Sequence, residues 1–282
     1  MLPVGLGAAV AWHETGIFFL GYFLLSLIAA IFYHAGANVL NDYFDYLNGA
    51  DNLNQAGISP FTGGSRMIQN KIMTPGETYI LGVLFLTAGS IIGLYLAYER
   101  GVALLLIGAM GLFSGYYYTA PPVFFAGRGL GELLVGLNFG VLSVAGSYYV
   151  HAQDISLVAV FASLPLSFLI AAILYINEFP DYDADKAAGK NHLVVYIGME
   201  RARWGFLFIV AGAYISIIAG IISDLLPIAA LFVIPAAIFG IKAVKGLFKD
   251  YKKTTELIPS IKATILCHLA TGLGLIVVFF VS

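Results

Sequence analysis

Residues 156–185 read SLVAVFASLPLSFLIAAILYINEFPDYDAD. The stretch has no charged side chain before Glu178, and it then ends in a run of acids. About 20 mostly apolar residues are enough for a helix to cross a membrane. We therefore expect a membrane-spanning helix near 156–178 with a cluster of carboxylates at its end.

The rest of the chain has the same character. Of its 282 residues, 60% are hydrophobic and 11% are charged, whereas soluble domains carry about 25% charged residues. A soluble fold would lack the polar surface to cover so much apolar material. Residues 1–12 are apolar but too short for a full crossing, and we expect them to belong to a partial first helix. Seven further segments meet the length test, near 16–45, 78–98, 101–119, 129–151, 204–222, 225–246 and 261–281.

These segments predict an all-α, polytopic integral membrane helix bundle. Residues 1–282 should form one transmembrane domain with nine transmembrane helices, of which the first is short or partial. Thirteen of the fourteen Lys and Arg residues fall in loops on one side, and the exception is Arg100. Because basic loops stay in the cytoplasm, we expect a multi-pass cell-membrane protein whose basic side is cytoplasmic.

A first acidic cluster lies at the end of the 16–45 segment, on the basic side. Asn38, Asp42 and Asp45 are spaced i, i+4, i+7 and share one helix face, with Asn41 beside them. Asp51 follows in the loop. A carboxylate at membrane depth costs on the order of a few kcal/mol, so a cluster of them indicates a function.

A second acidic cluster ends the 156–178 segment on the same side. Asn177, Asp181 and Asp185 are spaced i, i+4, i+8, so the Asn-x-x-x-Asp element occurs twice in the chain. Clustered carboxylates repel one another unless a cation lies between them. Mg²⁺ binds through one or two carboxylates plus substrate phosphates. Two Asp-rich helix ends that face each other could therefore hold Mg²⁺ ions on a diphosphate.

Basic and aromatic residues accompany both clusters. Arg66 and Lys71 follow the first cluster, and Lys186 and Lys190 follow the second. Such cations could stabilise charge on a departing diphosphate, or they could be orientation signals. Tyr118, in a Tyr-Tyr-Tyr run on the same side, could belong to an interfacial aromatic belt or turn inward to a phosphate.

These residues resemble the UbiA superfamily of intramembrane prenyltransferases. The family's two motifs are matched by Asn41-Asp42-x-x-Asp45 and by Asp181-x-x-x-Asp185, and Ser65-Arg66 through Lys71 is similar to its basic stretch. The resemblance covers nearly the whole chain. Many members have a third Asp where this chain has Gly49, and in this respect the motif looks like the branch that prenylates 1,4-dihydroxy-2-naphthoate in menaquinone synthesis.

The resemblance implies a Mg²⁺-dependent prenyltransferase of quinone biosynthesis. An allylic isoprenyl diphosphate would ionise, and an electron-rich aromatic acceptor would capture the carbocation. The implied Mg²⁺ ligands are Asp42, Asp45, Asp51, Asp181 and Asp185. The implied catalytic residues are Asp42, Asp45, Asp181, Asp185, Arg66 and Lys186. The implied substrate-binding residues are Asn38, Asn41, Arg66, Lys71, Tyr118, Asn177, Lys186 and Lys190.

Other interpretations stay open at this point. The acidic clusters could be the ion site of a cation-coupled transporter, or the chain could be a non-catalytic scaffold. Among acceptors, 4-hydroxybenzoate, haem and a glycerol-phosphate lipid compete with the naphthoate. A net charge of −2 argues against nucleic acid as a partner. Besides the lipid bilayer and the substrates, no sequence feature indicates an obligate protein partner. Prenyl chain length and oligomeric state are not specified by the sequence.

Overall fold

The computed structural model describes residues 1–50 and 64–282, and within them every regular element is helical. Asp51, one of the expected metal ligands, lies outside the described residues. The α-helices are α1 (Leu2–Thr15), α2 (Leu20–Asn48), α4 (Pro75–Arg100), α5 (Ala103–Tyr116), α6 (Gly131–Gly136), α7 (Ser143–Ala152), α8 (Leu157–Ala187), α9 (Leu193–Ile197), α10 (Met199–Ile222), α11 (Ala237–Asp250) and α12 (Ile258–Val281). The remaining elements are a π-helix, η2 (Leu137–Leu142), and the 3₁₀ helices η1 (Phe125–Arg128), η3 (Ile228–Ala236) and η4 (Thr255–Leu257).

The expected membrane fold is confirmed. In the described part of the chain, seven helical stretches are long and apolar enough to cross a membrane, and α5 is a shorter apolar helix. Together with α1, these stretches follow in the order that the sequence predicts. Helix α1 has 14 residues, which at 1.5 Å per residue span about 21 Å, so it is short as expected.

Several predicted segments differ in their bounds from the observed helices. Helix α5 ends at Tyr116 rather than near residue 119. The predicted 16–45 helix begins only at Leu20. Gly16 ends α1 in the left-handed conformation, with φ 68°, and Gly residues commonly end helices in this way.

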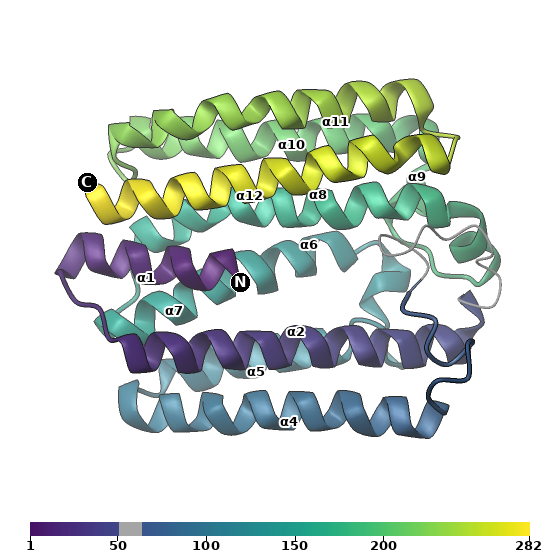
Figure 1. The fold of residues 1–282 in the computed structure, drawn as a ribbon, viewed down its shortest axis with the longest axis horizontal. Helices are drawn as coiled ribbons and strands as arrows, with labels where there is room; N and C mark the ends of the chain where they lie inside the picture. The colour runs from purple at the N-terminus through teal and green to yellow at the C-terminus, as the bar shows by residue number, and fades with distance from the viewer. Residues whose placement is uncertain (51–63) are drawn as a thin grey trace.

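The long helices lie side by side in a bundle (Figure 1). In that view α10, α11, α12 and α8 form one side, α2, α5 and α4 form the other, and α1, α6 and α7 lie between them. Helix α1 runs from the middle of the bundle to one end. Its residues Leu6 and Ala8 to Ala11 are fully buried, against α7, α8 and α12. A short helix is thus part of the central core.

The connectivity brings both acidic motifs to one end of the bundle. The carboxyl ends of α2 and α8 lie at the end that also carries α9, at the right in Figure 1. Thirteen of the fourteen Lys and Arg residues belong to the loops and helix ends on this side. The α1–α2 and α10–η3 connections lie at the opposite end. The fold therefore gathers the candidate residues of both halves at the basic end.

Candidate active site

Asp45 is the point at which the two motifs meet. Its carboxylate is buried and accepts hydrogen bonds from Asn41 Nδ2 at 2.9 Å and Asn48 Nδ2 at 3.2 Å. It also forms a 2.8 Å ion pair with Lys190 Nζ. Lys190 follows the second motif, 145 residues further along the chain. A direct contact therefore joins the end of α2 to the end of α8.

The end of α8 explains why Lys190 turns back to this position. Gly189 adopts the left-handed conformation, with φ 75°, which glycine adopts without a Cβ penalty. The Lys190 amide donates to the Asp185 carbonyl at 2.9 Å, and the Gly189 amide donates to the Lys186 carbonyl at 3.3 Å. This pair of bonds is the Schellman motif that ends many helices. The Asp-Lys-Ala-Ala-Gly-Lys sequence thereby directs Lys190 across to α2.

The first basic stretch lies against the other Asp of motif one. Ser65 donates from its hydroxyl and its amide to the Asp42 carboxylate, the latter at 3.3 Å. Arg66, the next residue, is half-buried with a left-handed backbone, φ 57°. Lys71 is exposed and also left-handed, with φ 58°. The contact with Ser65 thus brings the beginning of the basic stretch to Asp42.

One turn before Asp42, the same face of α2 carries a polar pair within the membrane-spanning part. Asn38 Nδ2 lies 3.3 Å from His34 Nε2. The His34 ring meets the edge of Phe139 in η2, with 5.2 Å between ring centroids. Both polar side chains are exposed. They extend the row of polar groups inward from Asp42.

The second motif separates into buried and exposed groups. Asp185 is buried, with Oδ2 3.2 Å from His192 Nε2, and Asp181 is half-buried. Asn177 is half-buried, and its Oδ1 has no hydrogen-bond partner. Lys186 is exposed, with Nζ 5.5 Å from the centre of the Tyr182 ring. Of the two lysines after this motif, Lys190 is the one in contact with an Asp of motif one.

Tyr118 turns inward. Its hydroxyl packs so close to Gly131 that a Cβ at that residue would lie 3.1 Å from the oxygen. Burial, with a smaller contribution from the charge of Glu178, raises the pKa of Tyr118. The hydroxyl therefore stays protonated and can donate a hydrogen bond.

Three buried ionisable residues complete this end of the bundle, and the sequence analysis assigned a role to none of them. They are Glu132, Glu178 and His192. Burial alone would lower the pKa of His192, but its contacts with Asp185 and Glu178 outweigh burial and raise the pKa to about 9. The available signal was an acid within an apolar segment, which both glutamates provide.

The lysine at the centre of the site keeps its charge. Burial alone would lower the pKa of Lys190, but the carboxylates of Asp45 and Asp185 hold it well above its ordinary value. A permanent cation among carboxylates, with amide groups beside it, suits a diphosphate bound together with metal ions. Hard oxygen donors of this kind fit Mg²⁺, so the described residues are compatible with the expected cofactor.

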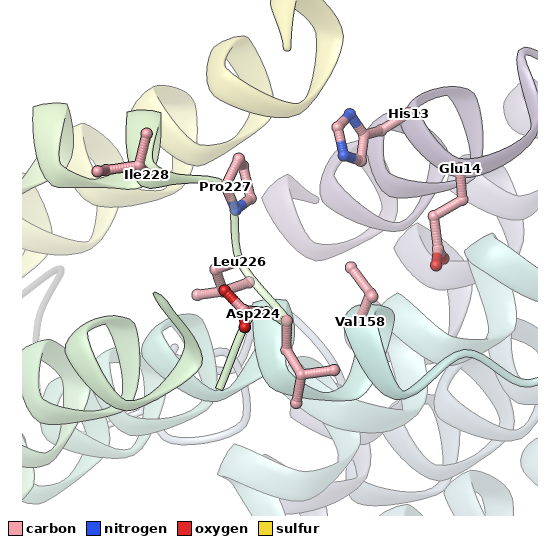
Figure 2. Close-up of a pocket in the computed structure, with 8 residues that line it drawn as sticks. His13, Glu14, Val158, Asp224, Leu226, Pro227 and Ile228 are labelled. Atoms are coloured by element: carbon pink, nitrogen blue, oxygen red, sulfur yellow. The ribbon is translucent and has the colours of Figure 1, made fainter. Parts of the chain in front are cut away.

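The opposite end of the bundle holds a cavity whose lining residues differ from those around the Asp motifs. Its volume is ≈350 Å³, and Figure 2 shows His13 and Glu14 on one side of it and Asp224 with Leu226 on the other. None of its lining residues is Lys or Arg. A cavity with two acids and no basic side chain does not suit a diphosphate, so the Asp-motif end is the candidate active site.

Two proteins of known function are similar to this chain over most of its length. The chain is 26% identical over 283 residues to a 1,4-dihydroxy-2-naphthoate octaprenyltransferase of Bacillus subtilis, covering 99% of this chain and 88% of that protein. It is 28% identical over 255 residues to a 2-carboxy-1,4-naphthoquinone phytyltransferase of Synechocystis, covering 89% of this chain and 79% of that one.

A solved structure shares the fold. It is that of a UbiA homologue from Archaeoglobus fulgidus bound to DMAPP and Mg²⁺, with a TM-score of 0.67, 20% identity, and coverage of 98% of this chain and 96% of that one. The UbiA prenyltransferase family itself matches residues 1–259. With both motifs at one end of a membrane bundle and the family matched over most of its length, the chain belongs to the UbiA prenyltransferase family and is an integral membrane prenyltransferase rather than a transporter.

Proposed function

We propose that this protein transfers an allylic isoprenyl group from its diphosphate to a 1,4-dihydroxy-2-naphthoate-like acceptor in quinone biosynthesis, at the cytoplasmic end of the bundle. The observation that carries the proposal is the 2.8 Å contact between Lys190 and Asp45. It joins two acidic motifs from distant parts of the chain around one half-buried cation. A diphosphate needs such a combination of cations and metal-binding carboxylates.

The carboxylates of both motifs would hold Mg²⁺. The ligands would be Asp42 and Asp45 from α2 and Asp181 and Asp185 from α8, and Asp51 stays a proposed ligand as well. When bound, Mg²⁺ supplies positive charge to the diphosphate oxygens. Asn41 and Asn48 hold the Asp45 carboxylate in place by hydrogen bonds of 2.9 and 3.2 Å. Such orientation of a ligand by its neighbours strengthens metal sites.

The basic side chains would stabilise the leaving group. As the allylic carbon–oxygen bond breaks, the electron pair stays with the diphosphate, and negative charge grows on its oxygens. Lys190, Arg66 and Lys186, with Lys71, are the proposed cations that neutralise this charge. The Tyr118 hydroxyl is a further donor to a phosphate oxygen. Fixed donors aimed at growing charge lower the barrier more than donors that must reorient.

The acceptor completes the reaction. A ring carbon of the acceptor gives its electron pair to the allylic carbocation and forms the new carbon–carbon bond. A proton then leaves that carbon, or carbon dioxide leaves if the carbon carries a carboxylate, and aromaticity is restored. Asn38 and Asn177 are the proposed polar contacts for the substrates. A dry, apolar bundle limits capture of the carbocation by water.

The choice of a naphthoate acceptor is supported by relatives. Two curated proteins that match most of the chain are named for transfer to 1,4-dihydroxy-2-naphthoate and to 2-carboxy-1,4-naphthoquinone. The residue Gly49, where many family members have a third Asp, also favours this branch. The competing acceptors are 4-hydroxybenzoate, haem and a glycerol-phosphate lipid.

An acceptor panel tests the proposal. Purified protein in lipid vesicles receives a labelled allylic diphosphate, Mg²⁺ and one acceptor at a time, and labelled lipid-soluble product is counted. We expect product with 1,4-dihydroxy-2-naphthoate and little with the other three, and none from Asp42→Ala. Product with a different acceptor alone would show that the acceptor is wrong. Unchanged product from Asp42→Ala would show that the site is wrong.

A further inference from the structure

Three buried ionisable side chains from different parts of the chain lie close together, and one of them contacts Asp185. Glu132 lies in the first turn of α6, Glu178 lies in α8, and His192 is the residue just before α9. Their exposed fractions are 4%, 7% and 2%. One ligand atom from each residue lies within 4.8 Å of the corresponding atoms of the other two. This spacing allows a single ion to reach all three residues after small movements.

Both carboxylates point an unsatisfied oxygen into this cluster. Glu132 Oε1 accepts a hydrogen bond from the Leu193 amide at 2.9 Å, but Oε2 has no hydrogen-bond partner. Glu178 Oε2 likewise has no hydrogen-bond partner and lies 3.3 Å from His192 Nδ1. A buried carboxylate oxygen without a partner is costly. The two oxygens therefore indicate a positively charged occupant.

The two ring nitrogens of His192 lie between the carboxylates of Glu178 and Asp185. His192 Nδ1 accepts a hydrogen bond from the Val195 amide at 3.3 Å, while Nε2 lies 3.2 Å from Asp185 Oδ2. A metal ion bound at Nδ1 would take the place of the Val195 amide as the partner of that nitrogen. Such an ion would also neutralise the Glu178 carboxylate, whose Oε2 lies 3.3 Å from Nδ1. A carboxylate–histidine–metal arrangement has this same geometry.

We propose that Glu132, Glu178 and His192 form a buried Zn²⁺ site, separate from the Mg²⁺ ligands of the two Asp motifs. Zn²⁺ takes imidazole nitrogen and carboxylate oxygen together, whereas Mg²⁺ prefers oxygen alone. The ion ties α6, α8 and the residue before α9 together.

Metal binding by the full chain in detergent tests this site. Each protein is stripped with a chelator, and Zn²⁺ is then titrated against a background of millimolar Mg²⁺. Retained zinc is measured by elemental analysis after gel filtration, and Tm is recorded at each concentration. The wild type should retain one zinc and gain Tm, since an ion that binds only the folded state stabilises it. Glu132→Gln should bind Zn²⁺ about tenfold more weakly or worse, and lose the gain in Tm.

Two matched variants separate this site from the other carboxylates at the same end. Asp42→Asn removes a charge from the Asp motifs, and Glu200→Gln removes an exposed charge at the start of α10. Both should retain zinc as the wild type does. Neither measurement requires turnover. A negative zinc result would therefore refute the Zn²⁺ site without affecting the prenyltransferase proposal, and a failed acceptor assay would leave the zinc result unaffected.

Several outcomes would overturn the site. They are a wild type that neither retains zinc nor gains Tm, an equal affinity in Glu132→Gln, and a loss of zinc in Asp42→Asn. A wild type that neither retains zinc nor gains Tm would mean that the cluster holds no metal ion. Folding of the variants is checked by elution volume and by the metal-free Tm, which removal of a buried charge should leave unchanged or higher. Glu178→Gln repeats the test from α8 if Glu132→Gln does not fold.

Discussion

Lys190 differs from Lys186, the other lysine that follows the second motif, because it is paired across the bundle. Its ammonium reaches Asp45 at 2.8 Å and keeps its proton because Asp45 and Asp185 surround it with negative charge. Lys186 precedes it by four residues but lies exposed on the Tyr182 ring. Two lysines of equal charge, one in the last turn of α8 and one just after it, thus occupy different environments.

Replacement of Lys190 by Met should lower turnover by about 10²–10³, the usual cost of removing one preorganised charge-stabilising group. Asp45 stays in place because Asn41 and Asn48 still hold it. Initial rates are measured with one allylic diphosphate at fixed salt and Mg²⁺.

Arg66→Ala and Lys186→Ala are measured beside it, because both are proposed cations of the leaving group. Lys249→Ala and Lys252→Ala carry the same charge change on exposed residues at the same end of the bundle and should lose almost nothing. Equal losses in all five variants would refute a specific role in favour of a general surface charge.

At the scale of elements, close packing of the α6–η2–α7 stretch on α8 places Glu132 opposite Glu178. The π-helix η2 interrupts this stretch at residues 137–142, and such segments occur often at functional sites. Gly140 within it touches Ser167 of α8 so closely that any Cβ would overlap that side chain. A glycine at this residue is therefore required by the approach of two helices.

Gly140→Ala should destabilise the protein by about 1–3 kcal/mol, because the added methyl overpacks the contact with Ser167. Gly108→Ala is the matched control, since nothing lies within 4 Å of a Cβ there. That change should leave stability equal or raise it by up to ~1 kcal/mol through helix propensity. Thermal unfolding in one detergent measures both variants. A Gly140→Ala protein as stable as Gly108→Ala would show that the two helices do not pack this closely.

Over the whole molecule, charge is distributed by end. The end with both motifs carries thirteen of the fourteen Lys and Arg residues, and the opposite end carries Arg100. Arg100 is itself engaged there, since it donates to the Val150 carbonyl at 2.7 Å and lies over the Phe19 ring. By the positive-inside rule, this bias predicts that the candidate active site faces the cytoplasm.

Single-cysteine labelling should confirm this orientation. In a Cys267→Ser background, Asn70→Cys and Asn191→Cys should react with a membrane-impermeant reagent only from the cytoplasmic side of oriented vesicles. Asp154→Cys and Ser223→Cys should react only from the other side. All four residues are exposed in loops or at helix ends. Labelling of residues 70 and 191 from opposite sides would contradict both the topology and the shared site.

Much of this architecture was predictable from the sequence. Long apolar runs predicted the membrane helices, and the acids at the ends of 16–45 and 156–178 predicted that both motifs share one end. These are local properties, because a helix crosses the bilayer according to its own length and polarity. Because each membrane-spanning helix takes the chain from one side of the bilayer to the other, the number of preceding helices determines the side on which each loop lies. The family resemblance rested on the same local motifs, and the family match confirmed it.

The contacts inside the site were not predictable in this way. The sequence offered Lys186 and Lys190 as equals, left Tyr118 between an interfacial belt and an inward orientation, and assigned no role to Glu132 or His192. Each of these depends on how distant helices pack and how one loop turns at Gly189. The Lys190–Asp45 pair spans 145 residues of sequence, and it forms because α2 and α8 approach each other in the folded protein. The spacing of residues along the sequence does not indicate which side chains a neighbouring helix will present.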